Sequence, residues 1–218
     1  MSWTLEDLLL FSPQVYWRLF VLENESVWPA QPVVLAAGLS LALGFILNRQ
    51  PSGRWLGPSL GAAWLWTGWH FVALRYGTVN WLAPTLAWGF YAEAALLAGL
   101  GLAGRIVFPQ RGRGARLGLG LVAAALVWPI LAPLGGRPWH EAEVIAIAPD
   151  PTAIATLGLL ALAERSRWTA LLCVGPVLWL VLSTLTLVTM GAWQGWAVLA
   201  ALLTGLVAWA APRGKNPG

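Results

Sequence analysis

Apolar stretches long enough to cross a lipid bilayer follow one another along most of the chain. A helix needs about 20 apolar residues to cross a hydrocarbon core of about 30 Å, and seven stretches approach this length. They cover residues 31–48, 55–75, 84–104, 117–135, 144–163, 169–190 and 195–211. The sequence therefore predicts an all-α, polytopic membrane helix bundle of about seven transmembrane helices, which forms a single integral membrane domain over residues 1–218.

The composition supports this interpretation because charge is scarce. Only 10% of the residues are charged and 58% are apolar, whereas soluble domains carry roughly 25% charged residues. Such a chain cannot cover a water-facing surface, which excludes a soluble enzyme, a disordered linker and a nucleic-acid-binding protein despite the net charge of +4. Cys173 is the only cysteine, so a disulfide framework and a cysteine-based zinc site are also excluded.

Arginine and lysine fall mainly into every second gap between the apolar stretches. These gaps contain ten of the 13 basic residues, namely Arg49, Arg54, Arg105, Arg111, Arg113, Arg116, Arg165, Arg167, Arg213 and Lys215. Positive residues concentrate on the cytoplasmic side of membrane proteins. We therefore expect the N-terminus outside and the C-terminus in the cytoplasm, in a bacterial inner membrane. Glu6 and Asp7 stand where a signal peptide would be basic, so we expect no signal peptide.

Most acidic residues fall on the opposite, outer side. They are Glu6, Asp7, Glu23, Glu25, Glu141, Glu143 and Asp150. Two explanations remain open. The outer loops simply lack basic residues, or an acidic outer face concentrates cations near an entrance.

Residues 1–28 form a segment of their own before the first apolar stretch. Ser12 and Pro13 have the residue types preferred at an N-cap and at the first helical position. They predict a short amphipathic helix from Gln14 to Leu22 that lies in the outer headgroup region, with Trp3, Trp17 and Trp28 as interfacial anchors.

Sixteen tryptophans are present, and most lie at the ends of apolar stretches, as expected of interfacial aromatic belts. The deeper ones are Trp64, Trp66, Trp69, Trp88, Trp128 and Trp179. An indole N–H in an apolar interior needs a hydrogen-bond partner. These rings therefore either pack as bulky side chains or line a cavity that holds a pigment, quinone or lipid.

His70 and Glu93 are ionisable residues within apolar stretches, and such residues are candidates for function. At 1.5 Å per residue their predicted depths differ by about 6 Å. If the second and third predicted spans are neighbours, the two side chains meet. Such a pair would relay a proton, hold a cation or neutralise itself.

A second polar cluster, His140, Glu141 and Glu143, lies in a predicted outer loop. A histidine and two carboxylates are weak candidates for binding a transition metal. The usual metal-binding spacings and cysteine ligands are absent, so a solvated loop is the alternative.

The Pro149-Asp150-Pro151 sequence interrupts the fifth apolar stretch, because proline does not fit inside an uninterrupted helix. In one interpretation Asp150 caps a helix that starts at Pro151, which would leave roughly 20 Å of helix. In the other the span is broken and residues 144–148 are tucked inside the protein.

Pro32 marks a similar break near the start of the first apolar stretch. The sequence pairs Gly-Leu, Arg-Trp and Gly-Pro follow Pro32 in the same order in which they follow Pro151. Residues 31–104 and 144–211 are thus possible three-helix repeats joined by a linker helix over 117–135. Paired proline-interrupted segments point to a transporter binding site, with Pro32, Pro149 and Pro151 as hinges. This arrangement of three, one and three helices resembles that of the seven-helix PQ-loop and sugar-efflux transporters, although their Pro-Gln motif is absent here.

The chain also resembles an uncharacterised bacterial family of multi-pass membrane proteins. The residues that carry this resemblance are Phe11-Ser12-Pro13, Tyr16-Trp17-Arg18-Leu19-Phe20, Asn24, Trp28-Pro29, Trp66-Thr67-Gly68, His70, residues 148–152 and residues 156–160. The family often has cysteine at the position of Asp150, where this chain departs from it. The resemblance implies a helical membrane bundle and no established activity.

Two functions follow as hypotheses. The first is a small transporter or channel-like protein for an ion or small solute, with Glu93, His70, Asp150 and Asn24 as candidate binding residues. The second is a non-catalytic subunit of a larger membrane complex, which has small-residue faces such as Gly57 to Gly61 and Ser40 to Gly44 for helix contacts. We expect no enzyme, no cofactor and no nucleic-acid partner. A retinal protein is also excluded, because it needs a lysine in its last span and Lys215, the only lysine, lies in the tail.

Overall fold

The structure, a computed structural model, describes residues 11–49, 51–109 and 112–211. Within these ranges the chain contains helices and no β-strand, which confirms the predicted all-α class. Several residues of the topology prediction lie outside the described residues. They are Trp3, Glu6, Asp7, Arg111, Arg213 and Lys215.

The described chain is divided into α-helices and shorter π- and 3₁₀-segments. In order they are α1 (Pro13–Val27), α2 (Ala30–Ile46), α3 (Gly53–Trp66), η2 (Thr67–Arg75), η3 (Tyr76–Thr78), α4 (Ala83–Leu102), α5 (Arg113–Val127), η4 (Trp128–Ile130), α6 (Leu131–Leu134), η5 (Trp139–Glu141), α7 (Pro149–Leu162), α8 (Arg167–Leu172), α9 (Val174–Thr189) and α10 (Gln194–Ala210).

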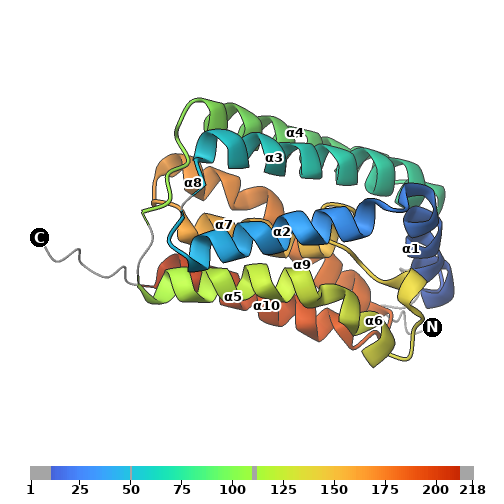
Figure 1. The fold of residues 1–218 in the computed structure, drawn as a ribbon. Helices are drawn as coiled ribbons and strands as arrows, with labels where there is room; N and C mark the ends of the chain where they lie inside the picture. Colours follow the sequence, from blue (N-terminus) through green and yellow to red (C-terminus); the bar gives the residue numbers. More distant parts are fainter. Residues whose placement is uncertain (1–10, 50, 110–111, 212–218) are drawn as a thin grey trace, which may run out of the picture.

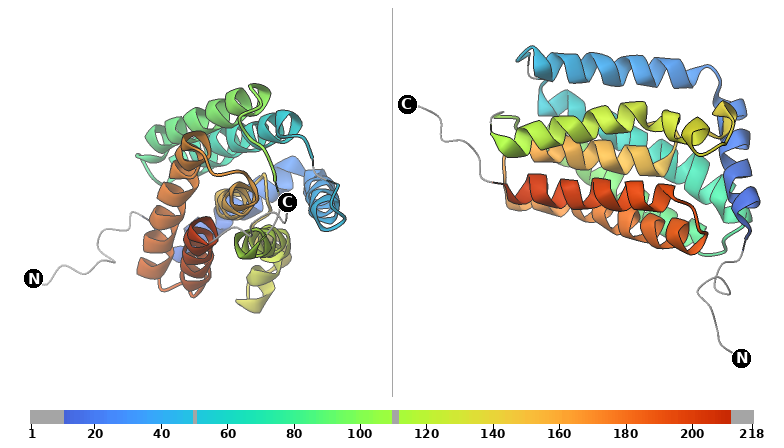
Figure 2. Two further views of the ribbon diagram at one scale, coloured as in Figure 1. Left: turned by 90° about the vertical axis from the view of Figure 1, so that its left-hand side faces the viewer. Right: turned by 90° about the horizontal axis from the view of Figure 1, so that it is seen from below.

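The longer helices run along one common direction and form a bundle, and α1 lies across one end of it (Figure 1). In the view along the bundle, α7 lies among the other helices (Figure 2). All residues of α7, from Pro149 to Leu162, are buried. The short seventh helix is thus the centre of the fold, and the longer helices surround it.

Helix α1 begins as the sequence predicts. The Ser12 side chain accepts a hydrogen bond from the Val15 N–H, and Pro13 occupies the first turn. Helices α1 and α2 meet at an angle of 89°. The buried face of α1 holds Tyr16, Trp17 and Phe20. The Phe20 ring stacks on that of Phe71 of η2, with 4.6 Å between the ring centres. Helix α1 therefore closes the end of the bundle.

Three described helical runs are long and apolar enough to cross a membrane. They are Ala83–Leu102, Arg113–Leu134 and Arg167–Thr189, and the bent pair α1 and α2 brings the number to four if it counts as one span. Helix α10 is apolar but shorter. The seven predicted stretches are therefore not matched by seven full-length spanning helices. Helices α2 and α10 have 17 residues each, α7 has 14 because it starts only at Pro149, and residues 55–75 are shared by α3 and the π-segment η2.

Residues 144–163 show where the sequence interpretation needs correction. Helix α7 starts at Pro149 with Ala148 as N-cap, so Asp150 lies inside the first turn and does not cap it. Residues 144–148 form a turn, in which the Ala148 N–H donates to the Val144 carbonyl at 2.7 Å. The predicted break is thus real, and its apolar flank is folded back into the protein. Proline is tolerated in a first helical turn because its missing N–H has no partner there.

Glycines allow close contacts between helices. A Cβ on Gly57 would lie 2.6 Å from the Gly101 Cα of α4, and one on Gly61 would lie 2.7 Å from the Ala94 carbonyl oxygen. Gly118 of α5 and Gly158 of α7 meet in the same way. The predicted small-residue face of Gly57 and Gly61 is therefore used inside the chain, between α3 and α4.

Candidate functional site

Besides Glu23, which is paired with His70 and Arg75, three carboxyl groups of the described residues are buried in the bundle. Glu143, Asp150 and Glu93 are 4%, 2% and 3% exposed, respectively. Burial of a charged carboxylate is costly unless hydrogen bonds or opposite charges compensate for it. The three residues differ in how far their surroundings provide this compensation.

Asp150 is held by two neutral donors on α9. The Trp179 indole N–H donates to Asp150 Oδ1 and the Ser183 hydroxyl donates to Oδ2, both at 2.7 Å. In the described part of the chain no basic side chain lies within 4.0 Å of this carboxylate. Its place in the first turn of α7 adds the favourable end of the helix dipole. These donors compensate for part of the cost of burying Asp150, and none of them carries an opposite charge.

Glu143 lies just before α7, beside Asp150. Trp128 donates its indole N–H to Glu143 Oε2 at 3.0 Å, and Arg137 Nη2 lies 4.0 Å from Glu143 Oε1. Burial, and then the negative charge of Asp150, raise the pKa of Glu143 to about 8. The pKa of Tyr16 on α1 is raised by burial and by both carboxylates. Tyr16 of α1, Glu143 and Asp150 therefore form an acidic cluster at the end of the bundle that α1 crosses.

Arg137 completes the edge of this cluster. Its guanidinium carbon lies 3.5 Å from the centre of the Trp17 ring on α1, and its Nη1 donates to the Glu141 carbonyl at 3.0 Å. A cation over an aromatic face is stabilised by the ring quadrupole. Arg137 thereby fastens the loop that carries Glu141 and Glu143 to α1.

Glu93 lies halfway along α4, away from this cluster, and faces the break between α8 and α9. Its Oε1 is buried and has no hydrogen-bond partner among the described residues. Its Oε2 lies 2.6 Å from the position that a Cβ would take on Gly175. The absence of a side chain at Gly175 therefore makes room for the carboxylate.

A groove of about 240 Å³ lies beside Glu93, between α3, α4 and α9. Its walls include Trp64, Phe90 and Trp179, and the backbone of Gly89 and Gly175. Gly89 precedes Glu93 by one helical turn, and Gly175 contacts the Glu93 carboxylate. The groove and the unpartnered carboxylate therefore adjoin.

The predicted pair of His70 and Glu93 does not form. His70 Nδ1 lies 2.8 Å from both carboxylate oxygens of Glu23, and Arg75 Nε donates to Glu23 Oε2 at 3.3 Å. The depth argument compared two adjacent spans, but α1 crosses the end of the bundle and brings Glu23 over η2. Glu23 was missed as a site residue. Its spacing of three and seven residues from Phe20 and Tyr16 places it on the buried face of α1, and this periodicity was the available signal.

Family models add one finding to this geometry. Residues 13–214 match the model of a family of unknown function, DUF6064. The chain belongs to this family. No curated protein and no solved structure is detectably similar to it. Family membership agrees with the resemblance to an uncharacterised family and assigns no activity.

Asn24, one of the residues that carry the resemblance, lies on α1 at the end of the bundle. Asn24 donates from Nδ2 to the carbonyls of His140 and Ala142 at 3.0 and 2.8 Å. Gln31 donates to the Asn24 carbonyl at 2.8 Å. Asn24 therefore fastens α1 to the η5 loop, and it does not contact the buried carboxylates.

The loop residues His140, Glu141 and Glu143 do not form a metal centre. Glu143 is buried in the acidic cluster, His140 is exposed, and Glu141 lies 4.0 Å from Arg137. Nowhere in the described ranges do three histidine, cysteine or acidic residues converge as metal ligands. The three side chains thus have different surroundings, although they are close in sequence.

The six deeper tryptophans fall into two groups. Trp64, Trp128 and Trp179 are buried, and their indoles donate to Thr156, Glu143 and Asp150, respectively. Trp66, Trp69 and Trp88 are 37%, 49% and 71% exposed on the outside of the bundle. The expectation that buried indoles need partners is confirmed for the first group. The second group faces the surroundings of the protein.

Proposed function

We propose that the chain is a multi-pass protein of the bacterial inner membrane that carries protons or small cations across the bilayer. The N-terminus would lie outside and the C-terminus in the cytoplasm. In this arrangement the seven apolar stretches are the spans, and α7 need not reach either surface by itself. Irregular backbone at membrane depth is tolerated where protein covers it, as it covers residues 144–148.

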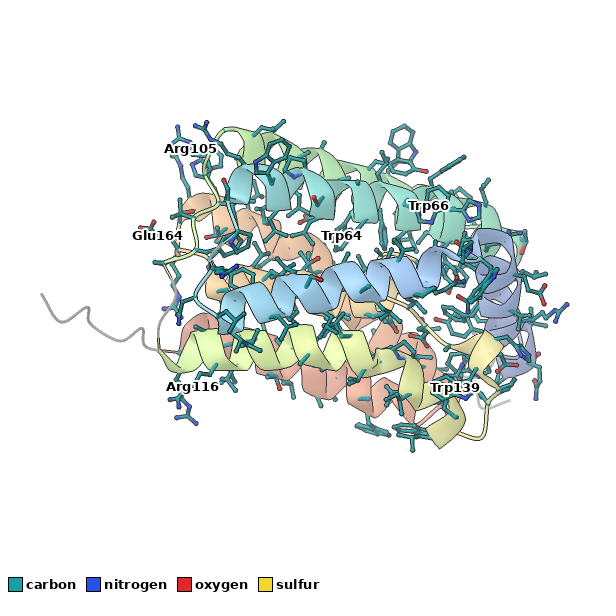
Figure 3. The ribbon with its side chains drawn as sticks, viewed as in Figure 1. Trp64, Trp66, Arg105, Arg116, Trp139 and Glu164 are labelled. Atoms are coloured by element: carbon teal, nitrogen blue, oxygen red, sulfur yellow. The ribbon has the colours of Figure 1, made fainter. Side chains whose placement is uncertain are left out.

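The distribution of side chains on the surface supports this orientation. Arg105, Arg116 and Glu164 lie at one end of the bundle, and Trp139 lies at the other (Figure 3). Between the ends, apolar side chains such as Trp88 and Leu178 are 71% and 64% exposed. A belt of this kind is compatible with lipid as the surrounding solvent.

One observation carries the transport proposal: Asp150 and Glu93 are buried carboxylates without a basic partner in the described structure. Ionisable residues at membrane depth mark ion and proton pathways. Trp179 connects the two, since its N–H binds Asp150 and its ring lines the groove beside Glu93. A cation that enters under α1 would meet Asp150 first and Glu93 further along the bundle.

Liposomes test this proposal. The purified protein is reconstituted around a pH-sensitive dye, and a potassium diffusion potential drives proton entry. We expect Glu93→Gln and Asp150→Asn each to slow the flux at least tenfold, because each removes a site for the positive charge. Glu164→Gln serves as the control, since Glu164 is exposed.

Two outcomes would contradict the proposal. Equal flux in Glu93→Gln, Asp150→Asn and wild type would remove these residues from the pathway. Absence of proton, Na⁺ and K⁺ flux in the wild type, relative to empty liposomes, would remove transport itself.

A second candidate function is that of a non-catalytic subunit in a larger membrane complex. Helix α2 favours it, because Val33, Leu39 and Ile46 are more than half exposed and, among the described residues, the Ser40 hydroxyl donates to the Ala36 carbonyl of its own helix. A partner helix would cover this face. Migration as a lone monomer in mild detergent would count against this alternative.

A further inference from the structure

The groove between α3, α4 and α9 has an aromatic wall with a fixed geometry. The Phe90 ring centre lies 4.8 Å from that of Trp64 and 5.0 Å from that of Trp179. The indole N–H groups of Trp64 and Trp179 bind Thr156 and Asp150. Their ring orientations are therefore set by hydrogen bonds to α7, and the rings contribute apolar faces to the groove.

The groove is also kept open by glycine. A Cβ on Gly89 would meet no atom within 4 Å, and a Cβ on Gly175 would collide with Glu93 Oε2. The first glycine leaves space for a ligand. The second leaves the Glu93 carboxylate next to the groove wall, with no side chain between them.

We propose that this groove binds a small organic cation whose positive charge is balanced by Glu93. This inference rests on the proposed function, in which Glu93 is a cation site, and it names the class of cation. An ammonium group is attracted to aromatic faces, most strongly to tryptophan. The alkyl or aryl substituents of the same molecule fit the apolar walls.

Two features favour an organic cation over a metal ion. Calcium and magnesium require about six oxygen ligands, whereas apolar side chains and glycine backbone form most of this groove. The volume of about 240 Å³ is smaller than the roughly 300–1,000 Å³ of pockets for drug-sized ligands. A compact quaternary ammonium compound matches both the chemistry and the size.

The test is binding of benzyltrimethylammonium, which carries a permanent charge, to the full chain in lipid nanodiscs. Isothermal titration calorimetry gives the affinity after subtraction of empty nanodiscs. We expect Glu93→Gln to weaken binding at least tenfold, because the counter-charge is lost. Glu164→Gln should bind like the wild type.

A matched pair of glycine variants separates the groove from the carboxylate. Gly89→Leu fills the groove and leaves Glu93 in place, so we expect at least tenfold weaker binding. Gly99→Leu changes an exposed position of the same helix that also has no atom within 4 Å of a Cβ, and it should bind like the wild type. Melting of each variant in the nanodiscs identifies any that fail to fold.

The outcomes distinguish this inference from the proposed function. No binding to the wild type, or equal binding by wild type, Glu93→Gln and Gly89→Leu, would overturn the inference, whatever the liposome flux. Binding that depends on both Glu93 and Gly89 supports it, even where no flux is found and the transport proposal fails.

Discussion

Glu143 illustrates how burial determines the chemistry of single residues in this protein. Its carboxyl is buried next to that of Asp150, and burial and that neighbouring charge raise its pKa from 4.5 to about 8. The Trp128 indole donates to the same carboxylate and Arg137 lies at 4.0 Å, yet neither offsets the burial. The residue is therefore best accommodated in its protonated form.

This shift predicts a pH-dependent stability. The folded protein holds the Glu143 proton more tightly than the unfolded chain, so the stabilising contribution is complete below pH 4.5 and is lost as the pH rises to about 8. We expect the melting temperature in detergent to fall by at least about 5 °C between pH 5 and pH 8. Glu143→Gln keeps an acceptor for Trp128 and should show a smaller decrease.

Glu141→Gln is the control, because Glu141 lies in the same loop but is not buried. Equal pH dependence in wild type and Glu143→Gln would contradict the assignment of the raised pKa.

At this scale the sequence predicts which residues matter better than it predicts their partners. Glu93 and Asp150 were identified as candidate binding residues, and Trp64, Trp128 and Trp179 as indoles that need partners. The partner of His70 was predicted wrongly, because it comes from α1, whose path across the bundle depends on an 89° bend. The spacing of residues along the sequence does not indicate a partner that comes from a distant helix through tertiary packing.

Among the elements, α7 and α2 show what hydropathy misses. In the sequence both helices follow a proline break and have similar apolar compositions. In the structure every residue of α7 is buried, whereas much of α2 is exposed. Glycines explain part of the difference, since Gly158 lets α7 approach Gly118 of α5. The internal repeat stays a prediction, and the two helices have different positions in the bundle.

The contact of α3 with α4 gives a prediction about an element. Gly57→Ala would place a Cβ 2.6 Å from backbone atoms of α4, and overpacking of this kind costs about 1–3 kcal/mol. We expect the melting temperature to fall by several degrees. Gly99→Ala on α4 has free space at its Cβ, and it should be neutral or stabilising, because alanine favours helix by roughly 0.5–1 kcal/mol. Equal melting of both variants would contradict the contact.

For the whole molecule, polarity along the bundle axis is the main feature. One end carries α1 and Trp139, and the other carries Arg105, Arg116 and Glu164 (Figure 3). Arg137 lies at the first end, because its guanidinium contacts the Trp17 ring of α1. The Arg165 guanidinium donates to the Ala211 carbonyl at 2.9 Å, so the end of α10 lies at the second end. The proposed orientation assigns the first end to the outside and the second to the cytoplasm, because basic residues are retained there.

Cysteine labelling tests this orientation, and the chain is well suited to it because Cys173 is its only cysteine. Cys173→Ser provides the background, and one cysteine is then introduced at His140 or at Glu164, both of which are exposed. We expect a membrane-impermeant maleimide to label the His140→Cys variant in intact spheroplasts, and to label Glu164→Cys only after the membrane is opened. The reversed pattern would invert the orientation and place Asp150 near the cytoplasm. Labelling of both positions in intact cells would mean that the bundle does not separate two compartments, which would contradict transport as well.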